Sequence, residues 1–205
     1  MKKYLVLMVG LVVCWLGFSY HKQMEILRGE ELVTDAYYGD LVSVKNDVEQ
    51  GAPLGYRFTF DDEERQYENQ TFNALHAAAS SGNGRLVEYL LQAGLDINTR
   101  TPEGWTPLYI AVRDGRDQVA MWFVYKGADL NVQTALGATA LTMAVTQPFE
   151  SEKARLDLLE YMLKRGADAQ LADRYGHTPL YYAQQQGNEE VVKLLEQYSG
   201  KANMK

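Results

Sequence analysis

Four short segments of the chain share one pattern, and their spacing constrains the fold more than any other feature. Residues 104–115 read GWTPLYIAVRDG, and GATALTMAVTQP and GHTPLYYAQQQG repeat nearly the same frame further along. The motif leucines, which are spaced 33, 33 and 39 residues apart, are Leu75, Leu108, Leu141 and Leu180. A fixed period near 33 residues predicts a solenoid, in which each unit is stable only against its neighbours.

The residue types in each copy predict two short helices per unit. A side chain that caps helices stands where the first helix would begin, and in three copies a glycine stands where that helix would end. The capping residues are Asn73, Thr106, Thr139 and Thr178, and the glycines are Gly82, Gly115 and Gly187. Proline follows the cap at Pro107 and Pro179, in the first helical position, where a missing N–H costs nothing.

This frame closely resembles the ankyrin repeat, G-x-T-P-L-H-x-A-A…G…V-x-x-L-L…G-A-D-x-N. The segments ALHAAASSGNGRLVEYLLQAGLDIN, TPLYIAVRDGRDQVAMWFVYKGADLN and TPLYYAQQQGNEEVVKLLEQY carry the resemblance, which covers about residues 30–200. It implies an all-α repeat solenoid of helix-turn-helix units with β-hairpin fingers, about five units long. It also implies a protein-binding surface on the fingers and the exposed side of the first helices.

The repeat frame divides the chain into an N-terminal segment, a repeat domain and a tail. We expect a signal peptide or membrane anchor at 1–20, a linker at 21–29, the ankyrin-repeat domain at 30–200 and a tail at 201–205. Within the domain, the expected parts are an N-terminal cap repeat at 30–54, an insertion at 55–70, and repeats at 71–100, 101–133, 134–172 and 173–200.

The N-terminal segment has the composition of an export signal or an anchor. Lys2 and Lys3 precede an apolar run, and residues 4–20 are barely long enough to span a bilayer. Three alternatives remain: a signal cleaved before Tyr20, a retained inner-membrane anchor, and a lipoprotein modified at Cys14. All three place the repeats outside the cytoplasm, in the periplasm or anchored to the inner membrane, and the short basic start suggests a bacterial protein.

Charge and cysteine content exclude several function classes. The chain has 20 Lys+Arg against 27 Asp+Glu, and this acidic balance argues against a nucleic-acid partner. Its only cysteine, Cys14, lies in the apolar run, so the repeats contain neither a disulfide nor thiol chemistry.

Ten extra residues separate the first two units, and their composition suggests two interpretations. Aromatic side chains surround an acidic run there, and the candidates for an insertion arm are Tyr56, Phe58, Phe60, Asp61, Asp62 and Tyr67. The segment is either a longer hairpin whose aromatics fold onto the first unit or an arm that grips a partner. A second break, at 147–155, would cover helix ends with Pro148 and Phe149.

The search for catalytic or metal-binding residues favours a non-catalytic protein. His76 occupies the motif histidine position, where the resemblance implies a structural tie between turns, and His177 lies in a finger. No cysteine or carboxylate stands at metal-ligand spacing around the histidines. We therefore expect no enzyme activity, cofactor, metal or small-molecule substrate, and a protein as the partner.

The resemblance assigns the candidate partner-binding residues by their positions in the frame. They are Phe72, Ser80, Ser81, Glu103, Trp105, Arg113, Asp114, Leu136, Tyr175, His177 and Gln185. Trp105 precedes a capping threonine, so its indole either packs on a neighbouring finger or anchors a partner.

Three hypotheses follow for the role. The chain resembles exported bacterial ankyrin proteins associated with catalases, which favours an adaptor. The alternative is an immunity protein that neutralises a secreted toxin or lipase effector, with the acidic insertion as a plug. An enzyme would need an activity that depends on His76 or His177.

Overall fold

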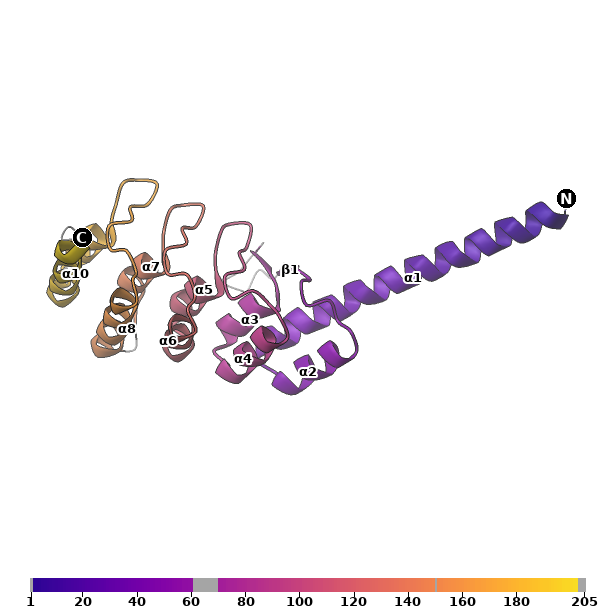
Figure 1. Cartoon of the computed structure of the whole chain (residues 1–205), viewed down its shortest axis with the longest axis horizontal. Coiled ribbons are helices and arrows are strands. Elements are labelled where there is room, and N and C mark those ends of the chain that lie inside the picture. Colours follow the sequence, from indigo (N-terminus) through magenta and orange to yellow (C-terminus); the bar gives the residue numbers. More distant parts are fainter. Residues whose placement is uncertain (1, 61–69, 150, 203–205) are drawn as a thin grey trace.

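Stacked pairs of helices form a two-layer array, and a long N-terminal helix projects from one end (Figure 1). This computed structural model describes the backbone of residues 2–60, 70–149 and 151–202, without the side chains of residues 2–18, 20, 60, 70 and 200–202. The first helices of successive units contact one another in order: α3 (Ala74–Ser81), α5 (Pro107–Arg113), α7 (Ala140–Thr146) and α9 (Pro179–Gln186). The second helices do the same: α4 (Gly84–Gln92), α6 (Asp117–Tyr125), α8 (Glu152–Lys164) and α10 (Glu189–Ala202).

The predicted helix starts are confirmed at the atomic level. Thr106, Thr139 and Thr178 each accept a hydrogen bond from the backbone N–H three residues later. Asn73 makes a reciprocal capping box with His76 at the start of α3. Each such cap contributes about 1 kcal/mol to stability, so the capping threonine or asparagine fixes where each first helix begins.

The N-terminal cap repeat is built from the end of one long helix and a short one. Helix α1 spans Lys2–Tyr38 without a break, and α2 (Leu41–Glu49) follows after Gly39. Leu32 and Val33 on α1 and Val44 on α2 are fully buried. The segment expected to be a linker, 21–29, continues α1 as helix, and its glycine, Gly29, lies so close to Tyr56 that a Cβ there would overlap the ring.

The expected signal or anchor falls on residues whose side chains are outside the description. Residues 2–20 belong to α1 by their backbone, and the side chains of residues 2–18 and 20 are not described. No helix within the described residues is long and apolar enough to cross a lipid bilayer.

Fingers connect the units and hydrogen-bond to each other. The finger of each of the last three units, at 101–105, 134–138 and 173–177, is a turn closed by a backbone hydrogen bond between its two ends at 2.9 Å. The N–H of Ala135 donates to the carbonyl of Glu103 at 2.7 Å, and that of Arg174 donates to Leu136 at 3.0 Å. Among the described residues only β1 (Phe58–Phe60) and β2 (Gln70–Phe72) pair as strands, so these fingers are turns rather than the expected β-hairpins.

Asparagines at the close of the second and third units tie each of them to the next unit. The side-chain oxygen of Asn98 accepts from the backbone N–H of Asp129 at 2.9 Å. Asn131 repeats the contact with Asp168 at 2.8 Å and donates to the carbonyl of Gly166. The Asn of the G-A-D-x-N close therefore satisfies backbone groups that would otherwise lack a partner.

The second break lies between α7 and α8. Phe149 is half-buried under the guanidinium of Arg155, which also donates to the carbonyl of Gln147 at 2.8 Å. Pro148 is exposed, so Phe149 rather than the expected pair covers this end.

Candidate protein-binding surface

The fingers project from one side of the helix layers, at the top of Figure 1. Two of them carry an exposed apolar side chain at the tip. Leu136 is 54% exposed and Tyr175 is 68% exposed. Their turns are joined by the hydrogen bond from Arg174 to Leu136, so the two side chains are held on adjacent tips of a rigid ladder. Exposed apolar side chains that a scaffold holds in place are typical of binding surfaces.

Aromatic rings extend this surface onto α9. The ring of His177 stacks on Tyr181 with centroids 3.9 Å apart, and Tyr175 lies 6.3 Å from His177. Tyr181 is 38% exposed. We call Leu136, Tyr175, His177 and Tyr181 the finger patch. The sequence assignment included three of them and missed Tyr181, which occupies the same frame position as the structural residue His76.

Asp173 holds the finger of the last unit in shape. Its carboxylate accepts hydrogen bonds from the backbone N–H groups of Tyr175 and His177 and from the hydroxyl of Tyr182. Although partial burial works against the charge, these bonds keep the pKa of Asp173 below its usual value. The bond to Asp173 raises the pKa of Tyr182 to about 12. The three hydrogen bonds to Asp173 thus hold the turn that presents Tyr175 in one conformation.

Trp105 is partly buried in a stack on its own unit. The indole lies 5.9 Å from the ring of Tyr109, and the guanidinium carbon of Arg113 is 4.4 Å from its centroid. Arg113 pairs with Asp114 at 3.0 Å, and these two side chains are only 9% and 4% exposed. Trp105 therefore packs on its own helix, α5, and Arg113 and Asp114 offer little surface to a partner.

Two assigned contact residues are corrected by their burial. Phe72 is fully buried and stacks on the ring of His76 at 5.9 Å, because the hairpin of β1 and β2 turns it into the core. Ser80 is 5% exposed, and its carbonyl accepts a hydrogen bond from Arg116 at 2.7 Å. Neither side chain is available to a partner.

The remaining assigned residues are spread over the second, third and last units. Ser81 is half-buried and donates to the carbonyl of Ala78 at 2.8 Å, which ends α3. Glu103 is half-buried, and its carbonyl binds the next finger. Gln185 is exposed on α9.

The described part of the insertion folds onto the first unit. The hydroxyl of Tyr56 donates to Glu30 at 3.3 Å, and Phe58 packs half-buried on the core. Thus Tyr56 and Phe58 follow the hairpin interpretation. The side chains of Phe60, Asp61, Asp62 and Tyr67 lie outside the described residues.

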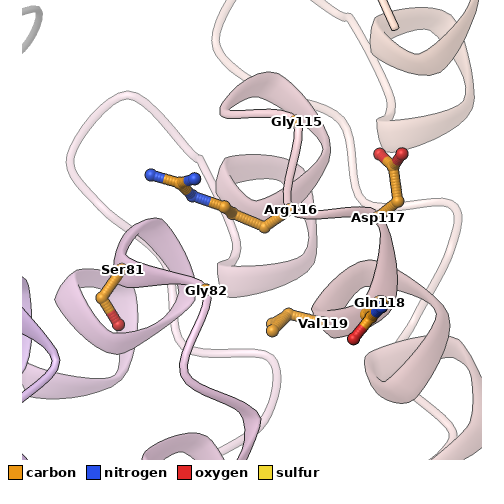
Figure 2. Close-up of a pocket in the computed structure, with 7 residues that line it drawn as sticks. All are labelled: Ser81, Gly82, Gly115, Arg116, Asp117, Gln118 and Val119. Atoms are coloured by element: carbon orange, nitrogen blue, oxygen red, sulfur yellow. The ribbon is translucent and has the colours of Figure 1, made fainter. Parts of the chain in front are cut away.

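A polar hollow of about 290 Å³ marks the seam between the second and third units (Figure 2). Arg116 reaches from the start of α6 towards the turn of Ser81 and Gly82, whereas Asp117 points away from it. A Cβ on Gly82 would approach the side chain of Arg116 to 2.9 Å. The side chain of Arg116 therefore passes over Gly82 to reach α3 of the preceding unit. The hollow is part of this structural contact between the two units.

His76 is a structural residue. It is fully buried, Nδ1 accepts from the backbone N–H of Asn73, and Nε2 lies 3.2 Å from the carbonyl of Trp105. This geometry requires the neutral ring with its proton on Nε2. Burial lowers the pKa of His76 to about 3, so the ring stays neutral at physiological pH. Within the described residues no group of three His, Cys, Asp or Glu side chains is arranged to hold a metal.

Comparison with known proteins identifies the repeats. The family model for ankyrin repeats, in three copies, matches residues 48–134 and 119–205, which together make up more than half of the chain. The chain belongs to the ankyrin-repeat family. Ankyrin repeats generally act as non-catalytic modules for protein–protein interaction, so the expected partner is a protein.

Two mammalian relatives share this ankyrin-repeat region. Ankyrin repeat and SOCS box protein 3 of Homo sapiens is 44% identical over 119 residues, which is 58% of this chain and 22% of that protein. The protein of the same name from Bos taurus is 42% identical over 128 residues, covering 61% of this chain and 23% of its own length. The chain thus spans less than a quarter of the length of these relatives.

Proposed function

We propose that this ankyrin-repeat array is a protein-binding module whose partner docks on the finger patch. The observation that carries the proposal is the set of exposed apolar and aromatic side chains on adjacent, hydrogen-bonded finger tips. Tyrosine supplies a large contact area at a low entropy cost, and binding energy concentrates in a few such side chains. Because the turns are already ordered, little additional freedom is lost on binding.

Affinity capture with matched variants tests this proposal. Tyr175→Ala and Leu136→Ala should each weaken retention of the partner about tenfold or more. Tyr38→Ala is the control, because Tyr38 is 65% exposed, close to the 68% of Tyr175, and lies on α1 away from the fingers. A partner retained equally by all three variants would place the binding site elsewhere.

We also propose that residues 1–20 export or anchor the repeats, in a bacterial periplasmic setting. The support is the sequence: two lysines followed by an apolar run. Mass spectrometry of the mature chain distinguishes the alternatives. An N-terminus at Tyr20 means a cleaved signal, one at a lipidated Cys14 means a lipoprotein, and an intact chain in the membrane means an anchor. An intact chain in the cytosol would contradict export.

The more specific roles stay predictions of the sequence. A catalase-linked adaptor would bind through the finger patch, whereas an immunity protein would use the acidic insertion. Deleting residues 56–67 should abolish binding in the second case and leave it unchanged in the first.

A further inference from the structure

Helix α6 is apolar on nearly every side. Residues 119–125 read VAMWFVY without a polar interruption. Four of these side chains are buried in the core, namely Val119, Ala120, Phe123 and Val124. Met121 and Trp122 are only partly buried, and Tyr125 is 64% exposed. A helix that is apolar all round is normally covered on every side, so its outward face needs an explanation.

The repeat itself shows that this outward face is unusual. The positions of Met121, Trp122 and Tyr125 correspond to Glu88, Tyr89 and Gln92 on α4, and to Glu160, Tyr161 and Lys164 on α8. The middle position is aromatic in all three helices, but its two companions are polar or charged on α4 and α8. The fold therefore does not require apolar residues at Met121 and Tyr125.

These side chains line a groove between α6 and α8 with a volume of about 570 Å³. Helix α6 contributes Gln118, Met121, Trp122 and Tyr125, and α8 contributes Asp157 and Tyr161. The α6 residues follow the i, i+3, i+4, i+7 spacing of one helix face. The two helices that line the groove, α6 and α8, lie on the side of the array away from the fingers (Figure 1).

Opposite charges stand at the two ends of the groove. At the C-terminal ends of the helices, Lys126 lies 5.0 Å from the ring of Trp122, and the guanidinium of Arg165 lies 5.1 Å from that of Tyr161. Towards the N-terminal end of α8 the groove is lined by the exposed carboxylate of Asp157. Such a pattern is self-complementary: a second groove turned end over end would place acid against base.

We propose that the α6–α8 groove is covered by the same groove of a second copy, through a two-fold axis perpendicular to both helices. Each helix then meets its own counterpart running antiparallel. Asp157 faces Arg165 of the second copy, Gln118 faces Tyr125, and Met121 faces Trp122. The dimer buries the outward face of α6 and leaves both finger patches accessible, so one assembly presents two binding sites.

Charge reversal on the full-length chain tests the symmetry directly. Sedimentation velocity in a mild nonionic detergent should show a concentration-dependent dimer. Asp157→Arg should raise its dissociation constant about tenfold or more, because arginines then face each other across the axis. The double variant Asp157→Arg/Arg165→Asp should restore the dimer, since the pairing is reversed but intact. A chain that is monomeric throughout, or a dimer unaffected by either change, would overturn the proposal.

Disulfide cross-linking supplies a second, geometric test. In a Cys14→Ser background, mixing Gln118→Cys protein with Tyr125→Cys protein should give a cross-linked dimer faster than either protein alone, because a disulfide needs Cα atoms within about 7 Å. Gln185→Cys, on the finger side, is the control and should stay uncross-linked. Cross-linking of Gln185 equal to that of the mixed pair would contradict the proposed axis. Equal cross-linking is what we expect of a dimer held only by the apolar N-terminal segment, because such a dimer would not align the two grooves.

Discussion

His76 joins two units through both of its ring nitrogens, and its neutral state is essential to that role. The ring accepts from Asn73 and donates to Trp105, so protonation would break the first bond inside the core. The pKa of His76 is about 3 in the fold because burial penalises the charged ring, against an ordinary value of 6.5. Below pH 6.5 the unfolded chain therefore binds more protons than the folded one.

We predict that the contribution of His76 to stability is present above pH 6.5 and is lost as pH falls towards 3. At pH 7, His76→Leu should lower the free energy of unfolding by about 1–3 kcal/mol, since it leaves two buried backbone groups unpaired. His76→Gln should cost less, because glutamine can complete the capping box. Urea unfolding of the three proteins at pH 4, 5.5 and 7 measures these differences. A wild-type minus His76→Leu difference that does not change with pH would contradict the assignment.

Gly137 combines a left-handed backbone with a close contact between fingers. Its φ is +81°, and a Cβ there would lie 2.8 Å from the backbone nitrogen of Arg174. Gly127 has φ +84° with open space around its Cα, so it isolates the backbone effect alone.

We therefore expect Gly127→Ala to cost about 1 kcal/mol of unfolding free energy, the penalty of the left-handed region. Gly137→Ala should cost at least about 1–2 kcal/mol more, because two fingers must separate. Thermal unfolding of both variants measures the difference. Equal costs for the two variants would mean that the two fingers at Gly137 and Arg174 move apart without strain.

At the scale of elements, α1 and α2 meet through carboxylates of like charge. Burial, together with Asp35 and Glu31 on α1, raises the pKa of Asp47 on α2 to about 6. Between pH 3.8 and 6 the folded state then binds more protons than the unfolded state, so this contribution to stability falls as pH rises through that window.

Asp47→Asn should consequently make the protein more stable than wild type at pH 8, with the advantage disappearing towards pH 4. Urea unfolding of both proteins across this range tests it. Glu49→Gln, at an exposed position of the same helix, is the matched control for the loss of one carboxylate. A destabilised Asp47→Asn protein at pH 8 would mean that the charged form is favoured at the α1–α2 contact.

At the scale of the whole molecule, α1 divides into a supported and an unsupported part. Its last turns pack on α3 through Leu32, Val33 and Ala36, all fully buried. Ile26 and Leu27, one to two turns earlier, are 40% and 46% exposed. Helical turns that bury few apolar contacts open locally at a lower free energy than turns packed in the core.

We therefore expect the rates of native-state hydrogen exchange to differ between the two parts of α1. Amides of residues 19–27 are expected to exchange at least about a hundredfold faster than those of 32–38, because opening them disrupts no core. Uniform protection along α1 would indicate that another molecule covers its exposed turns.

Local signals allowed much of the array to be predicted. Thr106, Thr139 and Thr178 act within three residues of themselves, and Gly82 and Gly187 act on their own backbone, so short sequence patterns locate these helix ends. The candidate site was harder, because exposure depends on neighbouring units. Phe72 and Tyr175 both precede a first helix, yet the first is in the core and the second is 68% exposed.

The sequence by itself determined the 33-residue period, the helix pairs and the ankyrin family, because each depends on residues close together in the chain. Tertiary structure decided that α1 continues through the expected linker, that Tyr181 joins Tyr175 in the finger patch, and that α6 and α8 enclose an apolar groove. These features depend on which units stack on which. Stacking removes some side chains from water and leaves others exposed, and neither outcome is recorded in the frame of a single repeat.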